Sequence, residues 1–245
     1  MKTPILGVNF DNLTMAEAAS KFVNFSLQDE VSVVVTANPE IVMAARKNAE
    51  FAAILNSADM VTADGIGVVK ASRLLKNKNL RLKERVAGFD LLMELFALPD
   101  AKNLKWYFLG GAPGVAAQAA NIMQGRFGIE IAGHHHGYFD EVGEDEIIDA
   151  IAASGADVVL AGLGFGRQEK WLTKHKNRLN AKVLMGVGGC FDVMSGNLRR
   201  APKIFQKLGI EWLFRLVRQP KRIWRQRILL KFVIVVILEK MRGRL

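Results

Sequence analysis

The sequence predicts an α/β fold in which a mostly parallel sheet carries helices on both faces, a Rossmann-like arrangement, followed by a C-terminal helical appendage. The β-branched run Val31–Thr36 is typical of a strand buried on both faces. Asn38-Pro39-Glu40 follows it, with an N-cap residue, a proline at the first helical position and an acid in the first turn. This strand-then-helix alternation continues to about residue 187, which predicts parallel strands joined by helices.

The remaining elements follow in order along the chain. Strands are expected at 60–63, 104–109, 128–132, 157–161 and 181–187, and helices at about 41–48, 68–76, 89–98, 115–126 and 143–153, with one more after 169. Glycine clusters at 110–114, 162–166 and 186–189 suit either tight turns or the approach of backbone N–H groups to a phosphate. In such sheets ligands bind beyond the carboxyl ends of the strands.

Composition divides the chain into two regions. Residues 199–245 hold 14 Lys and Arg side chains against two acidic ones, a net charge of +12. Residues 1–198 hold 20 basic and 22 acidic side chains, a net charge of −2. We therefore expect an α/β body at 1–198 and a basic appendage at 199–245. The single cysteine, Cys190, and a start without the apolar run of a secretory signal predict an intracellular protein in a reducing compartment.

The basic appendage predicts a partner that carries phosphate: an anionic lipid surface, a phosphorylated ligand or a nucleic acid. Residues 228–238 are strongly apolar but number only 11 and include Lys231, whereas a span of the bilayer needs roughly 20 apolar residues. An amphipathic helix lying on an anionic membrane surface fits this pattern better. The alternative is a helix packed on the body or on a second copy of the chain in a homo-oligomer.

Polar residues at strand ends are the candidates for chemistry. Thr36 and Asn38 follow the first strand, Asp64 follows the second, and Gln168 and Glu169 follow the strand at 157–161. A carboxylate at this edge is a candidate general base, able to take a proton from a substrate hydroxyl group. The alternative for Asp64 is that it caps the helix beginning after Gly65.

Several site classes are disfavoured. No glycine cluster continues into the Lys-Ser/Thr of a P-loop, and the first strand–helix unit has no clean G-x-G-x-x-G. The run 134–136 is three successive histidines without partners at ligand spacing, so we expect a polar loop and no metal. The sequence contains no Asp-x-Asp pair to hold a divalent ion on a diphosphate, so cationic side chains should do so instead. No cofactor is expected.

Four arginines in the appendage are spaced 3, 4 and 3 residues apart, at positions 215, 218, 222 and 225. On one continuous helix they would share a face, where their guanidinium groups could bind phosphate oxygens. The alternative is a solvated basic face, and Pro220 argues against an unbroken helix.

Taken in order, the motifs resemble those of the WecG/TagA/CpsF glycosyltransferases, glycosyltransferase family 26, over nearly the whole chain. The matching segments are 36–40 (TANPE), 62–67 (TADGIG), 84–90 (ERVAGFD), 110–114 (GGAPG), 162–169 (GLGFGRQE), 186–192 (GVGGCFD), 200–202 (RAP) and 209–212 (GIEW). One position departs from the family's pattern, because Arg167 stands where a proline usually precedes the Gln-Glu pair.

The resemblance implies a specific activity, closest to the N-acetylmannosaminyltransferases of wall teichoic acid linkage-unit synthesis. Such enzymes move N-acetylmannosamine from its UDP conjugate to the 4-hydroxyl of N-acetylglucosamine on undecaprenyl diphosphate, with inversion and without a metal. The resemblance assigns the base to Asp64, sugar-pocket or other active-site positions to Thr36, Asn38, Arg85 and Gln168, and diphosphate binding to Arg215, Arg222 and Arg225. It implies a peripheral location on the cytoplasmic face of the bacterial cell membrane.

Two alternatives accompany this interpretation. Members of the family also use N-acetylmannosaminuronic acid or glucose conjugates as donors. A nucleic-acid-binding protein using the basic appendage is the alternative from another class, although the apolar stretch at 228–238 suits lipid and not a DNA backbone.

Overall fold

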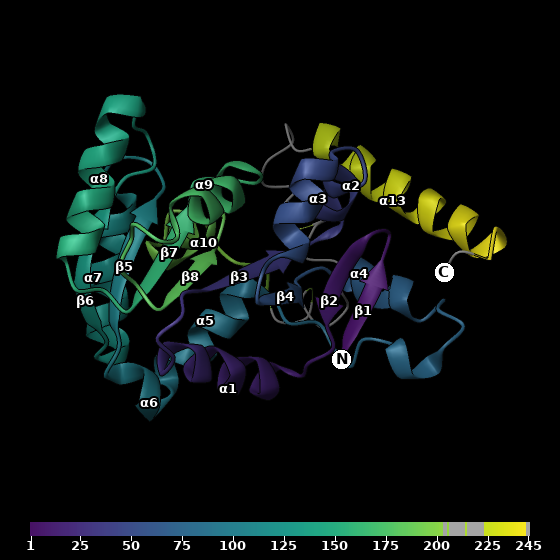
Figure 1. Cartoon of the computed structure of the whole chain (residues 1–245), viewed down its shortest axis with the longest axis horizontal. Coiled ribbons are helices and arrows are strands. Elements are labelled where there is room, and N and C mark those ends of the chain that lie inside the picture. Colours follow the sequence, from purple (N-terminus) through teal and green to yellow (C-terminus); the bar gives the residue numbers. More distant parts are fainter. Residues whose placement is uncertain (203–204, 206–213, 215–222, 244–245) are drawn as a thin grey trace.

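The computed structural model describes residues 1–202, 205, 214 and 223–243, and it confirms the α/β prediction (Figure 1). Six parallel strands form one sheet in the order β4-β3-β8-β7-β5-β6. These are β3 (Ser32–Ala37), β4 (Met60–Ala63), β5 (Lys105–Gly110), β6 (Glu130–His135), β7 (Val158–Gly162) and β8 (Val183–Gly186). The helices discussed below are α2 (Pro39–Ala45), α3 (Ala49–Asn56), α4 (Ile66–Ser72), α5 (Gly88–Ala97), α6 (Pro99–Lys102), α7 (Val115–Phe127), α8 (Glu141–Ala153), α9 (Arg167–His175), α10 (Cys190–Met194) and α13 (Ile223–Met241).

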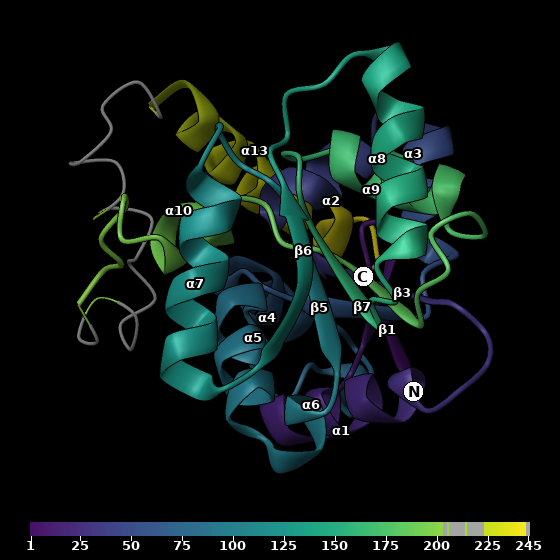
Figure 2. The ribbon, with the colours of Figure 1, turned by 90° about the vertical axis from the view of Figure 1, so that its left-hand side faces the viewer.

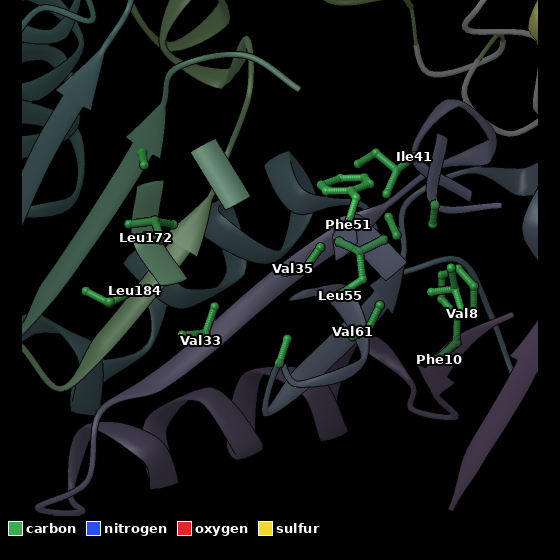
Figure 3. Packing of buried hydrophobic residues seen from close by; sticks show 14 of the residues in the cluster. Val8, Phe10, Val33, Val35, Ile41, Phe51, Leu55, Val61, Leu172 and Leu184 are labelled. Carbon is green, nitrogen blue, oxygen red and sulfur yellow. The ribbon is translucent and has the colours of Figure 1, made fainter. Parts of the chain in front are cut away.

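Each face of the sheet has its own apolar core, because successive side chains of a strand point to opposite faces. On β3, Val33 and Val35 belong to the cluster that α2, α3 and α9 cover, whereas Val34 belongs to the cluster under α5, α7 and α10. Figure 3 shows Val33 and Val35 on the same side as Phe51 and Leu55 of α3. Figure 2 shows α7 on one side of β5 and β6, and α8 and α9 on the other. This two-layer cover explains why the strands read as continuous apolar runs.

Two N-terminal features were not predicted. The strands β1 (Lys2–Ile5) and β2 (Val8–Asp11) form an antiparallel hairpin, and α1 (Met15–Ser26) follows. Leu6 and Gly7 both have positive φ, 51° and 91°, as a type I′ hairpin turn requires. Leucine rarely adopts that conformation, so the usual turn signal is missing from the sequence.

The expectation for the histidine run is wrong in part. The strand expected at 128–132 is β6, which extends to His135, so His134 and His135 lie in an edge strand and not in a loop. They pair with Phe108 and Leu109 of β5. Backbone pairing with a neighbouring strand outweighs local propensity at β6.

The helix expected at 68–76 also differs, since α4 begins at Ile66 and ends at Ser72.

The C-terminal helix α13 packs on α2 and α4 (Figure 1). Phe232 and Val236 are buried in the same cluster as β3 and α2, so part of the appendage completes the core. The opposite side of α13 is apolar too, and its exposed residues are Leu230, Val233, Ile234, Ile237, Leu238 and Met241. The alternative that this helix packs on the body therefore holds for one face of α13. Within the described residues, no helix is long and apolar enough to cross a membrane. The division into regions 1–198 and 199–245 stays a prediction.

Candidate active site

Three of the expected site residues lie at the carboxyl ends of β3 and β4, which pair in parallel. Thr36 is in β3 opposite Thr62 of β4. Asn38 is the N-cap of α2, where its Oδ1 accepts a hydrogen bond from the Ile41 N–H at 3.1 Å. The cap uses the amide oxygen, so the Nδ2 group is the one suited to donate to a ligand. Asp64 follows β4 directly, and its backbone N–H donates to the Ala37 carbonyl at 3.1 Å.

The loop after Asp64 lies against the start of α2. A Cβ added to Gly65 would stand 2.6 Å from Pro39 Cδ, so only glycine permits this approach. The N-cap residue of α4 is Gly65 and not Asp64. Both interpretations of Asp64, as base and as a residue that helps to start α4, stay predictions. The close approach brings Asp64 and Asn38 to the same side of the sheet.

Arg85 joins this group through the backbone of Asp64. Its Nε donates to the Asp64 carbonyl at 2.9 Å, and its Nη2 lies 3.8 Å from Oδ2 of Asp90, in the first turn of α5. Asp90 also accepts from Nη2 of Arg200, at 2.7 Å to Oδ2, and the Arg200 guanidinium lies over the Phe89 ring. One carboxylate thus ties the start of the appendage to the loop that carries Asp64. Sequence reasoning assigned no role to Asp90 or Arg200, although both stand in matched motifs.

Gln168 reaches the same edge from the first turn of α9. Its Oε1 accepts a hydrogen bond from the Gly188 N–H at 2.9 Å. Its amide packs on Gly186, where an added Cβ would stand only 2.7 Å from Nε2. Thr36 Oγ1 lies 3.5 Å from the carbonyl oxygen of Gly186. Gln168 is only 5% exposed, which leaves little of its amide for a ligand. The structure therefore brings Thr36, Asn38, Asp64, Arg85 and Gln168 together around the ends of β3, β4 and β8.

Glu169 is buried, with 1% of its surface exposed. Burial raises the pKa of its carboxyl group, against the opposing effect of hydrogen bonds from Gln168 and from the backbone N–H groups of Glu169 and Gly166. A base must reach its substrate, so this burial removes Glu169 as a candidate base and leaves Asp64.

A second group of loops lies at the ends of β5, β6 and β7. Gly110 and Gly162 end β5 and β7 and pair with each other, and a Cβ on Gly110 would stand 2.4 Å from the Gly162 carbonyl oxygen. The two glycine-rich loops therefore begin side by side. Arg167 donates to the Gly137 carbonyl at 2.9 Å and stacks on the Phe139 ring. The residue that departs from the family pattern therefore fastens the loop after β6 to the start of α9.

The appendage arginines are described only in part. Arg215 and Arg222 lie outside the described residues, and Arg225 is placed by the backbone of the first turn of α13. Within residues 1–202 and 223–243, no group of three His, Cys, Asp or Glu side chains is arranged to hold a metal.

Comparison with known proteins agrees with the motif order. The sequence matches the Glycosyl transferase WecG/TagA/CpsF family over residues 3–245. It is 38% identical over 226 residues to an N-acetylglucosaminyldiphosphoundecaprenol N-acetyl-beta-D-mannosaminyltransferase of Staphylococcus aureus (strain MRSA252), covering 91% of this chain and 87% of the relative. The protein of the same description from strain MW2 is 37% identical over the same shares. The chain belongs to the WecG/TagA/CpsF family of glycosyltransferases.

Proposed function

We propose that this chain transfers N-acetylmannosamine from UDP-N-acetylmannosamine to the 4-hydroxyl of N-acetylglucosamine on undecaprenyl diphosphate, with inversion and without a metal. The observation that carries the proposal is the meeting of Asp64 with Thr36, Asn38, Arg85 and Gln168 at one sheet edge, in a chain that resembles the two Staphylococcus aureus transferases throughout. The family match includes the basic C-terminal residues, which favours glycosyl transfer over nucleic-acid binding.

In the proposed reaction, the acceptor oxygen attacks the anomeric carbon of the donor as the bond from that carbon to the diphosphate oxygen breaks. The electron pair of that bond leaves with UDP, and the hydroxyl proton goes to the Asp64 carboxylate. Direct displacement inverts the anomeric centre. Asn38, through its Nδ2 group, and Thr36, through its hydroxyl, would hold the sugar.

The leaving diphosphate gains charge in this step and needs cationic groups near it. Arg215, Arg222 and Arg225 are proposed for this role, since guanidinium groups match phosphate oxygens. Arg85 would hold the loop that carries Asp64 in place, because its Nε donates to the Asp64 carbonyl.

Asp64→Asn tests the base. The variant should lose transfer by at least about 100-fold, the range in which general bases contribute, while its melting temperature stays near that of the wild type. Asp100→Asn, the same change at an exposed position on α6, serves as the control. Near-normal turnover by Asp64→Asn would remove Asp64 as the base.

Two further assays test the rest of the proposal. Activity that vanishes in EDTA would contradict the metal-free reaction. A panel of UDP-sugars would separate N-acetylmannosamine from the uronic acid and glucose donors.

The same function requires access to a lipid-linked acceptor, and we propose that α13 lies on the anionic membrane surface. Its outward side exposes Leu230 and Ile234, 70% and 57% respectively, next to the exposed cations Lys231 and Arg242. An apolar face flanked by basic side chains is the pattern of helices that lie in the headgroup region. Co-sedimentation with phosphatidylglycerol vesicles should fall when Lys231 and Arg242 are both replaced by Gln, which leaves the buried Phe232 and Val236 in place. Unchanged binding by this variant would overturn the assignment.

A further inference from the structure

We propose that Glu169 is a positioning residue, which fixes the orientation of the Gln168 amide and, through it, the turn at Gly188. The inference rests on the proposed function in one respect, namely that Gln168 belongs to the active site. The connection between the three residues is independent of that function.

A chain of hydrogen bonds with a fixed direction links them. The Gly166 N–H donates to Glu169 Oε2 at 2.7 Å, and Gln168 Nε2 donates to Glu169 Oε1 at 2.8 Å. The Gly188 N–H then donates to Gln168 Oε1 at 2.9 Å. A backbone N–H can only donate, so both ends of the chain present donors. The carboxylate must therefore accept twice, and the Gln168 amide must turn its nitrogen toward Glu169.

Only an acceptor at position 169 satisfies this arrangement. With glutamine there, one side-chain oxygen could accept from Gly166, but the amide nitrogen would then face Gln168. Gln168 would have to turn its oxygen to position 169, which places its nitrogen against the Gly188 N–H. Two donors facing each other in a buried site lose a hydrogen bond without replacement.

Burial makes this arrangement costly to keep and hard to change. Glu169 and Gln168 are both nearly inaccessible to water, so water cannot replace a lost partner. The raised pKa of Glu169 reflects the cost of holding a carboxylate there. Gly186 leaves the space that the Gln168 amide fills. The packing thus fixes the amide plane, and Glu169 fixes which way round it lies.

The consequence reaches the site through two contacts. Gly188 has a φ of 53°, and its N–H is held by Gln168, so the turn after β8 depends on the amide orientation. Gly186, on which the amide lies, also has its carbonyl oxygen beside the Thr36 hydroxyl. A reversed amide would present its oxygen to Glu169 and its nitrogen to the Gly188 N–H, next to the strand end that contacts Thr36.

A double-mutant cycle tests this role. Glu169→Gln should lower kcat/KM for transfer by about 10-fold in a chain that still folds, with a melting temperature lowered by roughly 2–12 °C because a buried hydrogen bond is lost. In a Gln168→Ala background the same change should cost less than about 2-fold, because the group through which it acts is gone. Glu146→Gln, the same substitution at an exposed position on α8, is the control and should have no effect. Equal costs in both backgrounds would overturn the proposal.

A spectroscopic measurement separates this proposal from the proposed function. In ¹⁵N-labelled protein, Glu169→Gln should shift the Gly188 amide resonance and the Gln168 side-chain amide pair, whether or not the chain transfers sugar. In the wild type, the same resonances should move together as Glu169 takes up a proton at low pH, which keeps the test open if the variant fails to fold. Resonances that stay in place in both experiments would overturn the proposal. Shifted resonances in a chain without transferase activity would instead overturn the proposed function.

Discussion

Phe232→Ala should release α13 from the body without unfolding the sheet. Phe232 is 2% exposed, and its Cε1 lies 3.8 Å from the point where a Cβ on Gly67 would stand. Removing a buried Phe costs about 3–5 kcal/mol. Val236, which is 4% exposed, is worth about 1.5–3 kcal/mol, and the partly buried Ile228 and Val235 pack on the same cluster. The Arg46–Glu239 ion pair at 2.9 Å is partly exposed on the arginine side and adds about 1 kcal/mol or less.

Phe232 is the largest side chain that α13 buries among its described residues, so its removal takes away a large share of the free energy that docks the helix. Hydrogen exchange should report this as a fall of about 100-fold or more in the protection of the α13 amides, while those of β3 and β8 keep theirs. Ile234→Ala is the matched control, because the side chain of Ile234 is 57% exposed on the opposite side. Unchanged protection of α13 in Phe232→Ala would refute the docking energetics. Equal loss of protection in β3 would show that α13 and the sheet unfold as one unit.

Three further outcomes are expected. Asp90→Asn should weaken the link between Arg85 and Arg200 and lower the rate of transfer. The melting temperature should drop by about 2–4 °C, since partly exposed ion pairs contribute about 1 kcal/mol. A normal rate of transfer would show that activity does not depend on this link. Replacing Leu230 and Ile234 together by Ser should lower binding to phosphatidylglycerol vesicles by about 10-fold or more, because each apolar side chain contributes about 1 kcal/mol or more on burial; binding that depends only on salt would contradict an apolar contact. The raised pKa of Glu169 means that the folded state keeps a proton that the unfolded state has lost, in the range from the ordinary value of 4.5 up to the raised pKa. Wild-type stability should therefore fall relative to that of Glu169→Gln as pH rises through this range, and parallel melting curves at every pH would contradict the shift.

The sheet could be predicted from the sequence because its signals are local. The β-branched run at β3 and the Asn38-Pro39 cap of α2 each identify an element without reference to the rest of the chain. The β1–β2 hairpin could not be predicted, because its turn relies on Leu6 in a conformation that leucine seldom adopts. The end of β6 is set by its pairing with β5. Because the histidines themselves carry no strand signal, the sequence alone predicted a loop there.

The positions that meet at the sheet edge were predictable from the sequence, but the hydrogen bonds that connect them were not. Positions after strands indicated Thr36, Asn38, Asp64 and Gln168, since carboxyl ends of parallel strands share one edge. The burial of Glu169 has no sequence signal, because Gln and Glu at the start of a helix are ordinary surface residues. The roles of these residues in catalysis stay predictions.

The structure also changes the meaning of the basic appendage. Two described parts of it contact the body near the candidate site. Its start is held where Arg200 meets Asp90, whose carboxylate also faces Arg85. The middle of α13 is held where Phe232 meets Gly67, three residues after Asp64. An appendage that served only to attract anionic lipid would need neither contact, because a flexible basic segment binds such a surface without ordered ends. Contacts on both sides of this segment, each near Asp64, support the proposed role of its arginines in diphosphate binding, and the Asp90→Asn and Phe232→Ala variants would each disturb one of these contacts.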